Sequence, residues 1–166
     1  MGAAVALSVT SMTCPNDVHN PASMARPPQL LIAGGGIGGL AAALACARQG
    51  CEVRLLERAP GFSEVGAGIQ IGPNVVRLLQ AWDLGAALRA VAAFPQKLRV
   101  RDAASGQELA SLRLAGHMEA RYGAAYATIH RADLLALLHD AVASRGDVAI
   151  QLGQRVQGWT ASADAV

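Results

Sequence analysis

The sequence is poor in aromatic residues, in charged residues and in cysteine. Aromatic residues make up 4% of the 166 residues and charged residues 16%, while hydrophobic residues reach 52%. A chain with so much apolar material can bury a core, so bulk disorder is excluded. The length suits one domain or a part of a larger protein.

Charge and cysteine content limit the partners and the compartment. The net charge is +2 and no long basic run occurs, which gives no support for nucleic-acid binding. The cysteines Cys14, Cys46 and Cys51 are odd in number and form no C-x-x-C pair. We interpret them as free thiols in a reducing compartment, which predicts a cytoplasmic protein, and no metal site is predicted.

One uncharged run has the length of a membrane span. Residues 30–47 carry no charge, and 18 or more apolar residues can cross a bilayer. Five glycines lie inside this run, and the next apolar stretch ends on an acid. We therefore predict a soluble strand–helix–strand unit and no membrane association. No Lys or Arg precedes Arg26, so a signal peptide would lack its positive region.

A glycine-rich stretch after a short apolar strand organises the chain. Gly34, Gly36 and Gly39 follow residues 30–33 and fit G-x-G-x-x-G. In that motif the glycines permit a tight turn, a close approach of the backbone to a pyrophosphate, and close packing of helix on strand. An Ala/Leu helix pattern continues to Ala47, and the start of such a helix attracts phosphates.

The next strand ends on a carboxylate. Gly50 closes the helix, residues 51–56 form a strand pattern, and Glu57 follows, 21 positions after Gly36. An acid at that place can accept a hydrogen bond from a ribose 2′-OH. Together these features predict a dinucleotide-binding fold, with a strand–helix–strand unit that binds no ligand as the alternative.

The ends of the chain differ in pattern from its middle. Residues 1–27 contain turn-forming Pro and Asn-Pro pairs and no core period, so we predict a disordered N-terminal extension. Residues 28–166 are predicted to form the folded part. A helix is expected over 134–144, a strand over 148–152, and another strand from Arg155.

A change of period marks a second substructure. Strict alternation in two short runs, joined by a Ser-Gly turn, predicts a β-hairpin at about 97–114 that is exposed on one face. The apolar side chains expected to lie uncovered there are Leu98, Val100, Leu112 and Leu114. Such a hairpin is not part of a parallel sheet, so it begins an antiparallel substructure.

From about Gln29 to Trp159 the sequence closely resembles the single-component FAD-dependent aromatic-ring hydroxylases, a family with salicylate, 3-hydroxybenzoate and 6-hydroxynicotinate monooxygenases among its members. The matching stretches are GGGIGGL at 34–40, LER at 56–58, GAGIQIGPN at 66–74 and YGAAYATIHRADL at 122–134. The first two recur in many FAD and NAD enzymes. The last two, in this order and spacing, are typical of the hydroxylases.

The resemblance implies FAD as cofactor, NADH or NADPH as co-substrate, and a small aromatic substrate with O2. It also implies a set of cofactor-binding residues. These are Gly34, Gly36, Gly38 and Gly39 at the pyrophosphate, Glu57 and Arg58 at the adenosine, Gly68, Ile69 and Gln70 beside the isoalloxazine, Arg131 at the phosphate and ribityl region, and Val156 at the adenine.

Arg131 has support from charge alone. The pattern places it at a helix start, where a cation opposes the helix dipole at a cost of roughly 0.3–1 kcal/mol. An anionic partner such as a diphosphate would remove that cost. A solvated arginine is the alternative.

The implied fold class is α/β, a Rossmann-type FAD-binding domain that is incomplete, with the start of an antiparallel β substructure. Family motifs that contain Asp-Gly and Gly-Asp do not follow Gly146-Asp147. We therefore interpret the chain as the N-terminal part of a hydroxylase, inactive alone, with the catalytic residues and most of the substrate domain beyond Val166. A truncated non-catalytic remnant and an NAD-linked dehydrogenase domain remain open alternatives.

Overall fold

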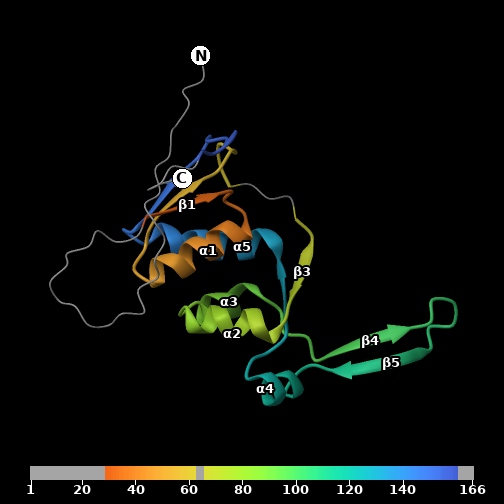
Figure 1. Ribbon diagram of the computed structural model, residues 1–166. Coiled ribbons are helices and arrows are strands. Elements are labelled where there is room, and N and C mark those ends of the chain that lie inside the picture. Colours follow the sequence, from red (N-terminus) through yellow and green to blue (C-terminus); the bar gives the residue numbers. More distant parts are fainter. Residues whose placement is uncertain (1–28, 63–65, 161–166) are drawn as a thin grey trace. The chain divides into compact units, whose positions relative to one another are not determined.

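The computed structural model describes residues 29–62 and 66–160, which form two compact units (Figure 1). The first unit contains the described residues up to Phe62 and those from Leu138 onwards, and the second contains the described residues in between. The predicted disordered extension, residues 1–27, lies outside the described residues.

The first unit is built on a parallel sheet in the order β1-β2-β7 (Figure 1). Its strands are β1 (Gln29–Ala33), β2 (Glu52–Leu56) and β7 (Val148–Gln151). Helix α1 (Ile37–Arg48) connects β1 to β2, because parallel neighbours need a crossover connection. The strand–helix–strand unit predicted around the glycine turn is therefore confirmed.

One face of α1 is buried. Its buried residues are Leu40, Ala43, Leu44 and Ala47, a spacing that places all four side chains on one side of a helix. This helix contacts both β1 and β2. Each buried leucine stabilises the fold by about 1.5–3 kcal/mol, so this face anchors the glycine turn that precedes it.

The carbonyl groups at the C-terminal end of α1 accept hydrogen bonds from the backbone that follows and from a distant arginine. Gly50 has φ of +83°, and its N–H donates to the Ala47 carbonyl at 3.0 Å, while the Cys51 N–H donates to the Cys46 carbonyl at 3.2 Å. These two hydrogen bonds together form the Schellman motif, so the predicted glycine cap is confirmed. Arg145, distant in sequence, also donates from Nη2 to the Ala47 carbonyl at 2.9 Å.

The second unit contains two antiparallel strand pairs and several short helices. Strand β3 (Gly68–Ile71) pairs with β6 (Ala127–His130), and β4 (Lys97–Arg101) pairs with β5 (Glu108–Arg113). Its helices are α2 (Pro73–Ala81), α3 (Gly85–Val91), α4 (His117–Tyr122) and the beginning of α5 (Arg131–Ala143). Helix α5 starts three residues before the predicted position, so Arg131 is its first residue.

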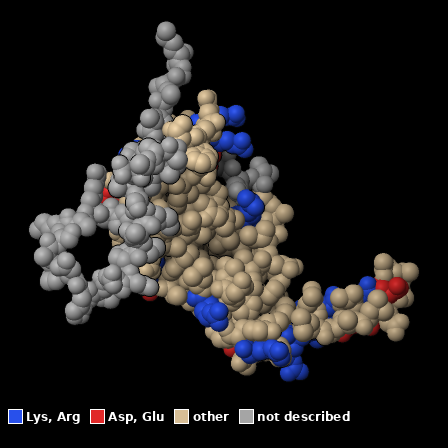
Figure 2. Space-filling view, in the orientation of Figure 1, with Lys and Arg blue, Asp and Glu red and all other residues tan. Residues whose placement is uncertain are grey.

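The predicted hairpin is confirmed, but not its one-sided exposure. Leu98 pairs with Leu112 and Val100 with Ala110, and every residue of β4 and β5 is exposed. No further strand joins this sheet among the residues that the structure describes. Both faces of the ribbon are therefore open, and Figure 2 shows charges of both signs along it.

Leu114 does not belong to the exposed set. It lies just past β5 and is only 5% exposed, and its N–H donates to the Gln96 carbonyl at 2.9 Å. Leu114 therefore sits at the base of the hairpin, where it joins the core.

The strand predicted from Arg155 does not form. The chain turns at Gly153, which has φ of +68°, and its N–H donates to the Ala59 carbonyl at 2.9 Å. The Gln154 N–H then donates to the Glu57 carbonyl at 2.8 Å. These bonds direct the chain across the end of β2, so the segment lies beside a loop and joins no sheet.

The uncharged run at 30–47 is divided between β1, the glycine turn and α1. Among the described residues, no helix is both long enough and apolar enough to cross a membrane.

We expect the apolar face of the hairpin to contribute to self-association and little to stability. The double change Leu98→Thr and Leu112→Thr alters side chains that are 50% and 48% exposed. It should change the free energy of unfolding by no more than about 0.5 kcal/mol per site and reduce self-association. The control Leu88→Ala, at a side chain only 1% exposed, should cost about 2–5 kcal/mol. Urea denaturation and sedimentation velocity measure both effects, and a loss in the hairpin variant equal to the control would contradict the expectation.

Candidate functional site

A pocket of about 600 Å³ opens in the first unit. It is lined by Ala33, Gly34, Leu56, Glu57, Arg58, Gln154, Arg155, Val156 and Gln157. These residues follow the carboxyl ends of β1, β2 and β7, the edge at which open α/β sheets bind their ligands.

Two glycines of the turn are required by the packing of the protein itself. Gly34 has φ of +105°, which other residues rarely adopt, and its N–H donates to the Leu56 carbonyl at 2.7 Å. A Cβ at Gly39 would collide with the Gly34 carbonyl oxygen. The close approach of α1 to the turn therefore depends on glycine at both positions.

Gly36 and Gly38 are glycines for a different reason. Both are exposed, and a Cβ added to either would meet no atom within 4 Å. Gly36 is the N-cap residue of α1. Because glycine has no side chain, no capping side chain binds the N–H groups at the start of this helix. Uncapped N–H groups and the positive end of the helix dipole favour an anion at this place.

Glu57 joins the turn after β1 to the loop after β2. Its Oε2 accepts the Gly35 N–H at 2.6 Å and its Oε1 accepts the Ala59 N–H at 2.8 Å. These two hydrogen bonds lower the pKa of the Glu57 carboxyl, and the bond from Ala59 has the larger effect. The positive charge of Arg58 lowers this pKa further. A carboxylate has about four acceptor sites, so capacity for a ribose hydroxyl remains.

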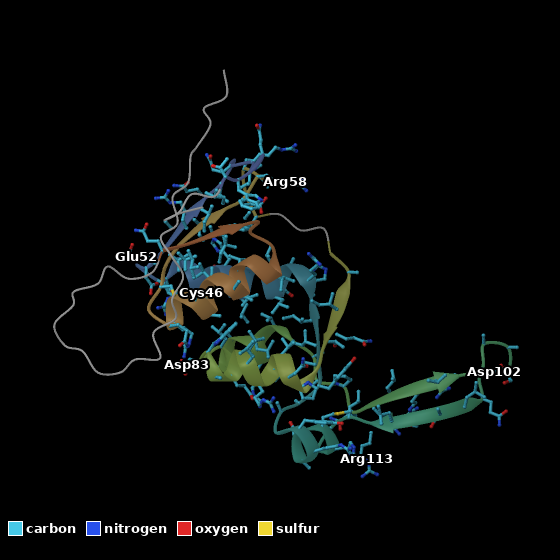
Figure 3. All side chains as sticks on the ribbon, viewed as in Figure 1. Cys46, Glu52, Arg58, Asp83, Asp102 and Arg113 are labelled. Atoms are coloured by element: carbon cyan, nitrogen blue, oxygen red, sulfur yellow. The ribbon has the colours of Figure 1, made fainter. Side chains whose placement is uncertain are left out.

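Cations and amides surround this carboxylate. Arg58 is exposed and lies past the carboxyl end of β2, at the opposite end of the strand from Glu52 (Figure 3). Arg155 lines the same pocket between Gln154 and Val156. Carboxylate, guanidinium and amide groups together suit a ligand that carries hydroxyl and phosphate groups.

The structure brings four predicted site residues into one pocket, namely Gly34, Glu57, Arg58 and Val156. Gln154, Arg155 and Gln157 line the pocket but were not predicted as site residues, and the last two lie in a segment that was predicted to be a strand. Their position directly after a predicted parallel strand was the available signal, since ligands bind at such strand ends.

Of the other predicted residues, Gly36, Gly38 and Gly39 belong to the first unit but do not line this pocket, and the rest belong to the second unit. Gly68, Ile69 and Gln70 form most of β3, and a Cβ at Gly68 would meet no atom within 4 Å. Gln70 is exposed, so its side chain is available to a ligand. Arg131, exposed at the start of α5, donates its backbone N–H to the Ala67 carbonyl at 3.3 Å.

The sheet, the glycine turn and the carboxylate at the end of β2 define a nucleotide-binding protein of the Rossmann class. A family model described as FAD binding domain matches residues 28–166, and the chain belongs to this family. The predicted cofactor, FAD, is confirmed at the level of the family. The match favours flavin over the NAD-linked dehydrogenase alternative.

Relatives of this chain are flavoprotein hydroxylases. It is 37% identical over 143 residues to 3-hydroxybenzoate 6-hydroxylase of Klebsiella oxytoca, covering 86% of this chain and 36% of the relative. It is 41% identical over 111 residues to 6-hydroxynicotinate 3-monooxygenase of Bordetella bronchiseptica, covering 67% of this chain and 29% of the relative. The predicted family resemblance is thereby confirmed.

The structure of Klebsiella pneumoniae HpxO with FAD and uric acid is similar in fold, with a TM-score of 0.71 and 27% identity. The match covers 81% of this chain and 33% of HpxO. The predicted Rossmann-type FAD-binding fold is confirmed as a partial domain, because the chain spans about a third of the length of the curated relatives it matches.

We expect Gly36→Ala and Gly39→Ala to fail in different ways. At Gly36 the new methyl meets open space, so the thermal midpoint should stay near that of the wild type while FAD binding weakens at least about tenfold. At Gly39 the methyl meets backbone, so unfolding should become easier by about 1–3 kcal/mol or more. Thermal melts and flavin titration separate the two, and equal losses of stability would be inconsistent with the two roles.

Glu57→Gln should reveal the pH dependence of the carboxylate. Because the pKa of Glu57 is lowered in the folded chain, the unfolded chain binds more protons on acidification, and stability is lost as the pH falls through the folded pKa. The wild type should therefore exceed the variant in stability at pH 7, and the difference should shrink below the ordinary glutamate pKa of about 4.3. Urea midpoints at pH 7 and pH 3 measure this, and a difference that does not change with pH would refute it.

Proposed function

We propose that this chain is the FAD-binding N-terminal part of an NAD(P)H-dependent flavoprotein monooxygenase that hydroxylates small aromatic substrates of the hydroxybenzoate or salicylate kind. The observation that carries the proposal is the pocket at the carboxyl edge of the parallel sheet, with Gly34, Glu57, Arg58 and Val156 in its lining. The relatives named as hydroxylases of 3-hydroxybenzoate and 6-hydroxynicotinate supply the substrate class.

The residues of the first unit fit the adenosine and pyrophosphate parts of FAD. Gly36 and Gly38 leave open space at the start of α1, where the backbone can approach a diphosphate. Glu57 keeps acceptor capacity for a ribose hydroxyl, and Arg58 adds a cation beside it. Val156 lines the same pocket and is exposed, so its backbone can meet the adenine.

The residues of the second unit fit a flat ring and a phosphate. Gly68 has no side chain, so a flat ring can lie close to the backbone of β3 beside Gly68, Ile69 and Gln70. Arg131 places a guanidinium, a group that pairs well with phosphate oxygens, in the first turn of α5.

FAD, when bound, would supply the redox chemistry of a hydroxylation in which NAD(P)H is oxidised, one atom of O2 enters the aromatic ring and the other leaves as water. The residues of this chain bind and orient the cofactor. The catalytic residues and most of the substrate pocket are proposed to lie outside the sequence of this chain. A cytoplasmic location is proposed as well, supported by the low cysteine content of three residues and by the lack of a C-x-x-C pair.

The test is a titration of the purified chain with FAD and with NAD+, followed by flavin fluorescence and equilibrium dialysis. We expect weak binding of FAD, weaker or no binding of NAD+, and loss of FAD binding in Gly36→Val. Glu57→Ala should weaken FAD binding by roughly 1.5–3 kcal/mol, because a charge-assisted hydrogen bond is lost.

The same preparation should not oxidise NADH faster when salicylate or 3-hydroxybenzoate is added. Stimulation by either compound would overturn the proposal that catalysis needs residues outside this chain. Binding of NAD+ in preference to FAD would overturn the proposed cofactor.

A further inference from the structure

Gly35, the middle of the three consecutive glycines in the turn, is crowded by side chains of the protein itself. It is buried, whereas Gly34, Gly36 and Gly38 are exposed. A Cβ at Gly35 would lie 2.7 Å from Cε1 and 3.1 Å from Cζ of Phe62. Real Cβ atoms do not approach carbon so closely, so the ring of Phe62 occupies the space that a side chain at Gly35 would need.

The ring of Phe62 is itself held in place. Its centroid lies 4.7 Å from that of the His139 ring, and the two planes are tilted by 57°. Such a tilted pair is a favoured aromatic geometry. His139 belongs to α5, and its Nδ1 lies 3.2 Å from Oδ1 of Asp140. The ring of Phe62 is therefore in contact with a residue of α5.

The same turn residue is also held by Glu57. The Gly35 N–H donates to Glu57 Oε2 at 2.6 Å, and Glu57 Cβ is 3.1 Å from the point where a Gly35 Cβ would stand. Phe62 and Glu57 thus meet at one glycine. Glycine has more backbone freedom than any other residue, so a turn with so many glycines needs outside contacts to keep one conformation.

We propose that Phe62 is a positioning residue for the cofactor: its ring, which contacts both Gly35 and His139, fixes the glycine turn and keeps the Gly35 N–H on the Glu57 carboxylate. Gly35 is glycine in order to accept this ring. The inference rests on the proposed binding of FAD at the turn.

The test is a double-mutant cycle on the full chain with two separate readouts, the urea midpoint of unfolding and the dissociation constant for FAD. Phe62→Ala should raise the dissociation constant about three- to tenfold, and Phe62→Leu should recover part of the loss. Gly35→Ala should impair both stability and FAD binding. Adding Phe62→Ala to Gly35→Ala should cost less than the sum of the single effects, because the clash is gone.

Gly36→Ala combined with Phe62→Ala is the matched control. No atom lies within 4 Å of a Cβ at Gly36, so these two changes should add in the urea midpoint. Additivity of Gly35→Ala with Phe62→Ala would overturn the contact. A Phe62→Ala chain with a lower midpoint but a wild-type dissociation constant would overturn the positioning role and leave a structural one. If the wild-type chain takes up no FAD, the proposed function fails, while the unfolding cycle still decides whether Phe62 fixes the turn.

Discussion

The carboxylate of Glu57 accepts the N–H of Gly35 with one oxygen and the N–H of Ala59 with the other, while its own backbone bonds to the strand and segment beyond. Four pieces of chain meet at this residue: the turn after β1, the end of β2, the loop after β2 and the segment after β7. Because each is tied to Glu57 by a hydrogen bond or by the chain itself, these contacts hold the pocket lining in one arrangement. A preformed site loses less conformational freedom on binding.

Much of this unit could be predicted from the sequence because its signals are local. The apolar run before Gly34, the Ala/Leu helix pattern through α1 and the glycine at position 50 each act within a few residues. The pocket residues Gln154, Arg155 and Gln157 were missed for the opposite reason. The pattern from Arg155 onwards favours a strand, and only the distant carbonyls of Glu57 and Ala59, which accept the N–H groups of Gln154 and Gly153, redirect the chain.

The exposure of both faces of the hairpin and the contact of Phe62 with Gly35 could not be predicted from the local sequence pattern. An alternating strand predicts one covered face, but what covers it is decided by residues elsewhere. Phe62 follows a proline–glycine turn, with no periodic pattern around it, so nothing nearby in sequence shows that its ring lies against Gly35. Contacts between distant residues decide both cases.

The bond from Arg145 to the Ala47 carbonyl joins residues 98 positions apart, and β7 follows Arg145 in the chain. During synthesis the N-terminal part of a chain emerges first, so β1, α1 and β2 leave the ribosome well before the third strand of their sheet. The loop closure that brings β7 to β2 adds only a small cost for each doubling of loop length, but it delays completion of the sheet. The nascent chain therefore exposes one edge of β2 while the whole second unit is being translated, and Gln154–Gln157, which line the pocket, emerge only after that unit.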